Sequence, residues 1–261
     1  MFFNKEKIKS NFNNHAQKYD KNAILQNIVA KKLIGLAIEE VGVAKNIIDL
    51  GSGSGFVSKE ISANKIINKN IFELDFALKS LLFSNSKKKK LLSINADIES
   101  LPIKPDIFDL ALSSMSLQWI NNLGIALNNV FHVLKPKSSF IFSILTDGTL
   151  RELTKSCKSL NVNLAINNFI KLKNLEKLLE NSNFNSYNII ELDEVKLYHK
   201  DIFQLIKSIK NIGASYSNRN SIKIIKKSDF ENLNQFYLKN FNSNGKIKAS
   251  WNVAYVKISK L

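Results

Sequence analysis

The fold class of this chain is decided by residues 46–55, Asn-Ile-Ile-Asp-Leu-Gly-Ser-Gly-Ser-Gly. The short apolar run Asn46–Leu50 predicts a buried strand, because a glycine cluster follows it at once. Glycines at 51, 53 and 55 allow backbone conformations that other residues rarely adopt. Residues 56–63 then have a helical pattern. A strand, a glycine loop and a helix in this order are typical of a ligand-binding turn at the carboxyl end of a strand in a parallel α/β sheet.

Strands and helices alternate on both sides of this loop. Apolar residues recur at helical spacing between Asn22 and Glu40. Further strands are expected at 70–74, 91–95, 107–113, 139–145, 187–197 and 251–258. Further helices are expected at 76–83, 122–134, 172–180, 201–209 and 227–240. Alternation of this kind predicts βαβ units, and therefore a doubly wound, Rossmann-like α/β fold with a seven-stranded sheet.

The chain of 261 residues is expected to form a single domain, because it has three prolines and no long linker. Residues 1–40 form an N-terminal helical arm and helix in this interpretation, and 46–145 form the ligand-binding core. The polar stretch 146–170 is expected to be a lid. Residues 171–261 complete the sheet and add helices that bind the substrate or a carrier.

The composition is that of an ordinary globular protein, with 44% hydrophobic residues, 23% charged residues and a mean hydropathy of −0.11. No apolar run is long enough to span a bilayer, and the first residues do not resemble a secretory signal. The single cysteine, Cys157, excludes an internal disulfide and is interpreted as a packing residue. A cytoplasmic location and a monomer are the default expectations.

The formal net charge of +16 has two interpretations. Only Arg151 and Arg219 are arginines, whereas a reader of nucleic-acid bases usually presents arginine forks. The lysines are therefore either solvated surface residues or a field that attracts an acidic protein partner. The run Lys87–Lys90 is interpreted as a solvated loop.

Three acidic residues end successive expected strands: Asp49, Asp75 and Asp97. The carboxyl ends of parallel strands meet at one edge of the sheet, where ligands bind. A carboxylate at such a position can accept hydrogen bonds from ribose hydroxyls. The pattern predicts a nucleoside-like ligand that carries no phosphates.

A dinucleotide site and a P-loop fit the glycine loop less well. Gly51 and Gly53 match the first two positions of Gly-x-Gly-x-x-Gly, but its third position is Phe56. Asp49 would also repel a pyrophosphate, and no Gly-Lys-Ser/Thr follows. S-adenosylmethionine (SAM) fits better, since its sulfonium and ammonium groups favour nearby carboxylates. A tight turn without a ligand stays open as an alternative.

Several segments together resemble a known family. Residues 48–55, 73–75, 96–102 and 108–110 are similar to class I SAM-dependent methyltransferases. Narrower similarity links the chain to the malonyl-acyl-carrier-protein O-methyltransferases of biotin synthesis, the BioC family. The segments that carry this narrower similarity are 11–20 with Leu25-Gln26, 113–119, 148–153 and 212–215. The chain departs from the superfamily at 133–139, where the usual Gly-Gly is missing from a turn.

The resemblance implies methyl transfer from SAM to the free carboxylate of malonyl-acyl-carrier protein. The products would be S-adenosylhomocysteine and the malonyl methyl ester that primes pimeloyl synthesis for biotin. A carboxyl group is ionised at pH 7 and needs no general base. No metal, nucleic acid or membrane is expected to take part, and acyl carrier protein is the expected partner. Lysines of 146–170 and of the helices after Asp201 are expected to bind this acidic carrier.

The resemblance also assigns cofactor contacts residue by residue. Asp49 would hold the glycine loop, Asp75 would bind the ribose, and Asp97 with Ile98 would flank the adenine. An alternative for Asp97 is a helix N-cap. The methionine part would lie against Gly51, Ser52, Gly53 and Gly55, and the sulfonium would lie beside Ser113 and Ser114.

The acceptor side is assigned in the same way. Tyr19 would close over the methyl donor, and Gln118 and Trp119 would face the acceptor. Arg151 is the first candidate for recognition of the malonyl carboxylate, and Arg219 is a weaker one. The three histidines share no spacing that suggests a metal site.

Two other functions remain open from the sequence. One is a methyltransferase that acts on a quinone or another small molecule. The other is a SAM-binding assembly factor or protein-modifying enzyme like those of respiratory complex I. Methylation of nucleic-acid amino groups is disfavoured, because Pro102, Pro105 and Pro136 are not adjacent and the Asn/Asp-Pro-Pro-aromatic motif is missing.

Overall fold

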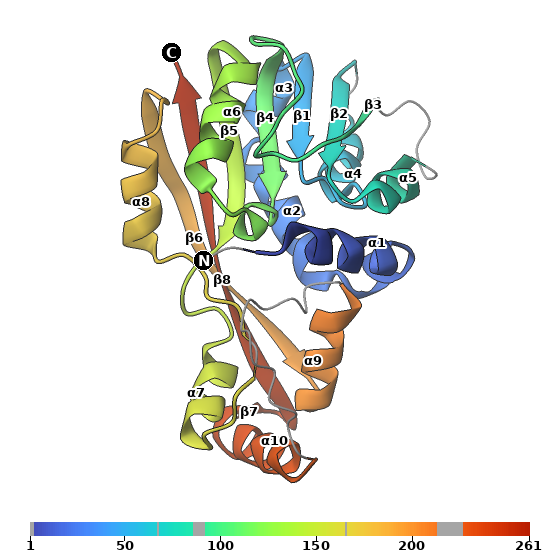
Figure 1. Cartoon of the computed structure of the whole chain (residues 1–261), viewed down its shortest axis with the longest axis vertical. Helices are drawn as coiled ribbons and strands as arrows, with labels where there is room; N and C mark the ends of the chain where they lie inside the picture. Colours follow the sequence, from blue (N-terminus) through green and yellow to red (C-terminus); the bar gives the residue numbers. More distant parts are fainter. Residues whose placement is uncertain (1–2, 67, 86–91, 165, 213–226) are drawn as a thin grey trace.

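The fold is described from a computed structural model, which places residues 3–66, 68–85, 92–164, 166–212 and 227–261. The Lys87–Lys90 run, residues 213–215 of a family-like segment and Arg219 lie outside these described residues. Figure 1 shows a twisted sheet with helices on both faces and a narrower lower part built on two long strands.

The sheet has the strand order β3-β2-β1-β4-β5-β8-β6, and the short β7 pairs with β8. Its first five strands are parallel, whereas β8 runs antiparallel to both β5 and β6. The expected doubly wound, Rossmann-like sheet is therefore confirmed. The strands are β1 (Asn46–Leu50), β2 (Asn70–Asp75), β3 (Leu92–Asn95), β4 (Phe108–Ser114), β5 (Leu134–Leu145), β6 (Ser186–His199), β7 (Asn242–Ser243) and β8 (Lys246–Lys260).

Helices cover both faces of this sheet, because buried apolar side chains alternate along its strands. Ile47 of β1 packs into a cluster with α2 and α4, whereas Ile48 packs on the opposite face with α6 and α8. The helices are α1 (Lys5–Asn22), α2 (Ile24–Leu36), α3 (Ile38–Val43), α4 (Phe56–Ala63), α5 (Leu78–Asn85), η1 (Leu117–Trp119), α6 (Leu123–Val133), α7 (Arg151–Ser159), α8 (Leu172–Glu180), α9 (Ile202–Asn211) and α10 (Lys227–Phe241).

Some expected boundaries are wrong for local reasons. The single helix expected over 22–40 is divided between α2 and α3 at Ala37, which has a non-helical backbone. Helix α5 begins later than expected, because the carboxylate of Asp75 accepts a hydrogen bond from the backbone of Ala77 and forms a turn there. Strand β5 begins before Pro136 rather than after it, beside a register shift in its pairing with β4.

The lower part of the molecule determines where a ligand can bind. Strands β6 and β8 extend beyond the parallel strands and carry α7, α9 and α10 (Figure 1). Helix α1 lies across the carboxyl ends of the parallel strands, between the two parts. Among the described residues, no helix has the length and apolar character needed to cross a membrane.

Candidate active site

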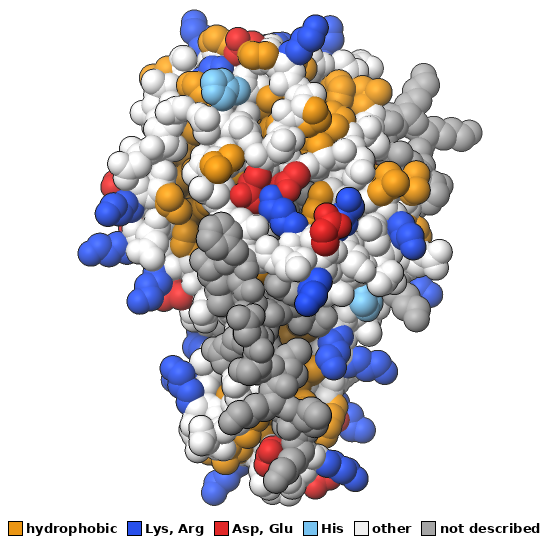
Figure 2. All heavy atoms as spheres, in the orientation of Figure 1, with side chains coloured by type: hydrophobic (Ala, Val, Ile, Leu, Met, Phe, Trp, Pro, Cys, Tyr) orange, Lys and Arg blue, Asp and Glu red, His pale blue; other side chains and the backbone are white. Residues whose placement is uncertain are grey.

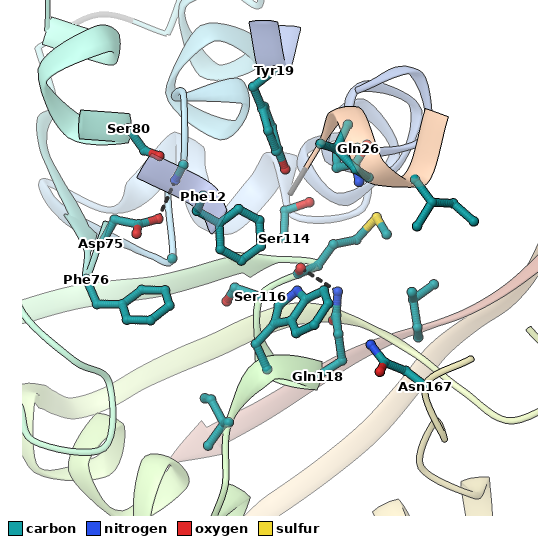
Figure 3. A pocket seen from close by; sticks show the side chains of 18 of the residues that line it. Phe12, Tyr19, Gln26, Asp75, Phe76, Ser80, Ser114, Ser116, Gln118 and Asn167 are labelled. Atoms are coloured by element: carbon teal, nitrogen blue, oxygen red, sulfur yellow. Dashed lines mark hydrogen bonds between the residues drawn. The ribbon is translucent and has the colours of Figure 1, made fainter. Parts of the chain in front are cut away.

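A cavity of about 460 Å³ lies between the carboxyl ends of the parallel strands and the lower part of the molecule. The glycine loop and the ends of β2 and β4 form one side of it, and α1 covers it. The opposite side is formed by residues 163–164 and 166–169, by α9 and by Trp251 of β8. Figure 3 shows Tyr19, Gln26, Ser114, Gln118 and Asn167 pointing into this space from five different elements.

Two glycines give the loop its shape. The backbone N–H groups of Gly51 and Ser52 donate to the carbonyl oxygen of Leu74, at 2.7 and 3.0 Å. Gly51 has φ +72°, and a Cβ there would lie 2.3 Å from the Cβ of Ser116. Gly53 also has a left-handed φ of +55°, but a Cβ there would meet nothing within 4 Å. The loop therefore leaves open space next to its backbone at Gly53, where a ligand can approach closely.

Asp75 lies at the end of β2 and is 6% exposed. Its Oδ2 accepts a hydrogen bond from the Gly53 N–H at 2.8 Å, and its Oδ1 accepts one from the Ala77 N–H at 2.7 Å. Burial raises the pKa of Asp75 to about 6, although these two backbone donors lower it. A carboxylate held in this way still has lone pairs for ligand hydroxyls, as a ribose would require.

Several buried polar atoms around the cavity have no hydrogen-bond partner among the described residues. They are the hydroxyls of Ser52, Ser54 and Ser114, Oε1 of Gln26 and Gln118, and Nε1 of Trp251. Buried polar groups in folded proteins are nearly always bonded, so these atoms fit a polar ligand. Asp49 is 1% exposed and lines the same cavity, which suits the positive groups of SAM. The residues present therefore fit this cofactor.

The predicted adenine end is closed by an ion pair from α1. The Oδ1 of Asp97 accepts the Glu99 N–H at 2.9 Å, so the carboxylate does cap a turn. Lys5 Nζ pairs with Asp97 and with Glu99, the latter at 2.5 Å. Ile98 is buried beside them and lines the cavity. Because Asp97 also lines the cavity, capping and contact with a ligand are compatible roles for it.

Aromatic residues join α1 to the rest of the site. Phe12 meets Trp119 edge to face, with ring centroids 5.7 Å apart, and Tyr19 lies beside Phe56. Burial and the nearby carboxylates of Asp75 and Asp20 raise the pKa of Tyr19. Its hydroxyl is therefore protonated near neutral pH and available as a donor in the cavity.

Three of the predicted site residues do not line the cavity. Ser113 is fully buried, and its hydroxyl donates to the Leu50 carbonyl oxygen at 2.8 Å, so it joins β4 to β1. Gly55 is the N-cap residue of α4. Arg151 is the first residue of α7, and its Nη1 lies 2.6 Å from Oε2 of Glu194 on β6. The Arg151 guanidinium holds the pKa of the Glu194 carboxyl at about 2.

Comparison with known proteins agrees with this geometry. A sequence profile described as "Methyltransferase domain" matches residues 48–142, which span the strands around the cavity. A malonyl-[acyl-carrier protein] O-methyltransferase 2 from Ilyobacter polytropus is 32% identical, and the match covers 98% of each chain. The chain belongs to the malonyl-[acyl-carrier protein] O-methyltransferase family.

Other matches are broader. Human "Arginine-hydroxylase NDUFAF5, mitochondrial" is 28% identical, over 80% of this chain and 62% of that protein. The crystal structure of the YcgJ protein from Bacillus subtilis superposes with a TM-score of 0.60 at 15% identity. That match covers 88% of this chain and 98% of that one, and it supports the fold alone.

For this member of the malonyl-[acyl-carrier protein] O-methyltransferase family, the cavity contains residues that the sequence did not single out as site residues. Ser116, Gln26, Asn167 and Lys210 all line it. Ser116 belongs to the family-like segment 113–119, and Gln26 belongs to the family-like pair Leu25-Gln26. Both residues were therefore part of a quoted motif, although neither was given a role. Asn167 and Lys210 lie in the second half, where no local pattern indicated a side chain that faces a ligand. Among the described residues, no group of three His, Cys, Asp or Glu side chains could hold a metal ion.

Proposed function

We propose that this protein transfers the methyl group of SAM to the free carboxylate of a malonyl group on acyl carrier protein. The product is the malonyl methyl ester that primes pimeloyl synthesis for biotin. The observation that carries this proposal is the 32% identity over nearly the whole chain to a relative of that name. The cavity at the strand ends has acidic residues and hydroxyls without a partner among the described residues, and it supports the SAM-binding part of the proposal independently.

We place the cofactor along the row of strand ends. Asp97 and Ile98 would flank the adenine, and Asp75 would accept hydrogen bonds from the ribose. The loop of Gly51, Ser52 and Gly53, near Asp49, would hold the methionine part. When bound, SAM supplies a methyl group that its sulfonium already activates.

The reaction needs little acid–base chemistry from the protein. Transfer would form a bond between a carboxylate oxygen and the methyl carbon and break the carbon–sulfur bond, with the electron pair of that bond left on sulfur. Two opposite charges disappear and no proton moves, so no general base is required. The protein's contribution is alignment of the two reactants and exclusion of water. Phe12, Tyr19 and Trp119 are suited to the second task, because these aromatic rings line the cavity and Phe12 packs against Trp119.

Growth complementation tests this proposal in cells. The gene is introduced into a biotin-requiring bacterium that lacks its own malonyl-carrier methyltransferase. We expect growth without biotin for the wild type and none for Asp75→Ala at equal protein level. Growth that fails for a soluble, SAM-binding wild-type protein would contradict the proposal.

The alternative of a complex I assembly factor has one observation in its favour, the similarity to the human arginine hydroxylase. That match spans 62% of the human protein, whereas the match to the bacterial methyltransferase spans both chains almost completely. The difference in coverage favours the methyltransferase, and copurification with a respiratory subunit would favour the alternative.

A further inference from the structure

The cavity has a marked asymmetry in its positive charges. Among the described residues, two lysines line it, Lys5 and Lys210. Lys5 pairs with the carboxylates of Asp97 and Glu99, so its charge is already balanced at the adenine end. Lys210 belongs to α9 on the opposite side and pairs with no described carboxylate. Lys210 is exposed, so its ammonium, which no described carboxylate balances, lies at the rim of the half of the cavity that the cofactor contacts proposed above leave free.

Helix α9 holds the backbone of Lys210 beside the cavity. Ile206 and Ile209 of α9 line the cavity with it, and Ile202 and Leu205 are fully buried beneath them. The side-chain amide of Asn211 donates to Oδ1 of Asn22 at 3.0 Å, which attaches the end of α9 to the end of α1. A lysine in the last turn of a helix is favoured by the helix dipole alone. The helix dipole alone does not explain why this lysine lines the cavity.

Recognition of the malonyl carboxylate also requires a residue other than Arg151. Arg151 was the first candidate for recognition of the malonyl carboxylate, with Arg219 a weaker one, but the Arg151 guanidinium is paired with Glu194 and does not line the cavity. An enzyme that distinguishes a malonyl from an acetyl group must sense the free carboxylate. A lysine that is exposed at the rim, with a flexible stem, can reach such a carboxylate.

We propose that Lys210 pairs with the free carboxylate of the acceptor and makes the enzyme prefer this charged substrate to its neutral methyl ester. The inference rests on the proposed function. Before transfer the acceptor carries a negative charge that the ammonium attracts, and after transfer this charge is gone. The same lysine thus favours substrate binding and allows the ester to leave.

The test compares two ligands that differ only in this charge. Malonyl-pantetheine and its methyl ester, which both lack the carrier's phosphate, are titrated into the protein loaded with S-adenosylhomocysteine. We expect the wild type to bind the malonyl form about tenfold more tightly than the ester. Lys210→Met should abolish this preference and change the Kd for S-adenosylhomocysteine by less than twofold. Lys207→Met, an exposed lysine on the same helix that does not line the cavity, should keep the preference.

Three results would overturn the assignment. The first is a preference for the malonyl form that survives in Lys210→Met or is missing in the wild type. The second is a large loss of S-adenosylhomocysteine affinity in Lys210→Met, because the lysine would then bind the methionine carboxylate. The third is a loss seen only with phosphate-bearing malonyl thioesters, which would assign Lys210 to the carrier arm. Wild-type turnover of malonyl-acyl-carrier protein is measured in parallel, and its failure would reject the proposed function instead.

Discussion

At the scale of single residues, Asp75 connects the chemistry of the site to pH. Its carboxylate is almost completely buried at the end of β2, and this burial raises its pKa to about 6 in the ligand-free protein. A carboxyl group whose pKa is raised on folding favours the folded state when protonated. Its contribution to stability is therefore present below about pH 4 and is lost as the pH rises through 6. Ribose hydroxyls, in contrast, require the ionised form as a hydrogen-bond acceptor.

We therefore predict that cofactor affinity falls in mildly acidic solution. S-adenosylhomocysteine should bind about tenfold more weakly at pH 5 than at pH 7, because Asp75 must lose its proton to accept the ribose. Asp75→Asn should bind weakly at both values, with little dependence on pH. Isothermal titration calorimetry measures both proteins. Equal affinity of the wild type at pH 5 and pH 7 would show that Asp75 does not control binding.

Single residues also mark the limit of prediction from the sequence. The glycine loop and the acids at 49, 75 and 97 were predicted to meet at one edge of the sheet, and all of them line the cavity except Gly55. Ser113 and Ser114 were predicted to lie beside the sulfonium, but Ser113 is fully buried, and Ser116 lines the cavity with Ser114 instead. Which of these serines faces the cavity depends on the local turn after β4. The alternation of apolar and polar residues in the sequence does not determine the conformation of that turn.

At the scale of elements, α1 acts as the cover of the cofactor half of the cavity. Its first turn is attached by Lys5 to Asp97 and Glu99, and its middle by Phe12 to Trp119 and Phe76. The backbone N–H of Lys79 also donates to Oδ1 of Asn13, at 2.9 Å. A cofactor below this helix cannot leave along this side without breaking some of these contacts.

Loosening this cover should speed up cofactor release. We expect Lys5→Met to increase the dissociation rate of S-adenosylhomocysteine about three- to tenfold, as a partly exposed ion pair contributes about 1 kcal/mol. Stopped-flow displacement measures the rate. Lys7→Met, an exposed lysine on the same helix, serves as the control. An unchanged rate in Lys5→Met would mean that α1 does not limit release.

The elements differ in how well sequence patterns predict them. Strand β1, the glycine loop and α4 were predicted at their observed bounds, because a short apolar run, glycines and a helical pattern follow one another there. The placement of α1 was not predictable in this way. It depends on pairs such as Lys5 with Asp97, which are 92 residues apart in the sequence and have no local pattern.

At the scale of the whole molecule, the net charge of +16 is carried mainly by lysines. Figure 2 shows Lys and Arg side chains at the top and along both sides of this face, including the sides of the lower part that carries α7, α9 and α10, with fewer acidic side chains. Exposed lysines Lys155 and Lys158 belong to α7, within the stretch 146–170 that was expected to form the lid. An acidic carrier would be attracted to such a surface.

If this surface binds the carrier, charge reversal should affect the carrier-linked substrate alone. We expect the double variant Lys155→Glu/Lys158→Glu to raise KM for malonyl-acyl-carrier protein about three- to tenfold. Turnover of malonyl-pantetheine should stay unchanged, because that substrate has no carrier to attract. Steady-state kinetics with both substrates provides the comparison. An equal KM for the carrier-linked substrate in variant and wild type would place the docking surface elsewhere.

The central claim is that the malonyl carboxylate on acyl carrier protein accepts the methyl group, and the mass of the carrier tests it most directly. The purified protein is incubated with SAM and malonyl-acyl-carrier protein, and the intact carrier is weighed by mass spectrometry. The account predicts a gain of one methylene on the malonyl carrier, no gain on acetyl-acyl-carrier protein, and no gain with Asp75→Ala. An unmodified malonyl carrier, with a wild-type protein that still binds SAM, would contradict it.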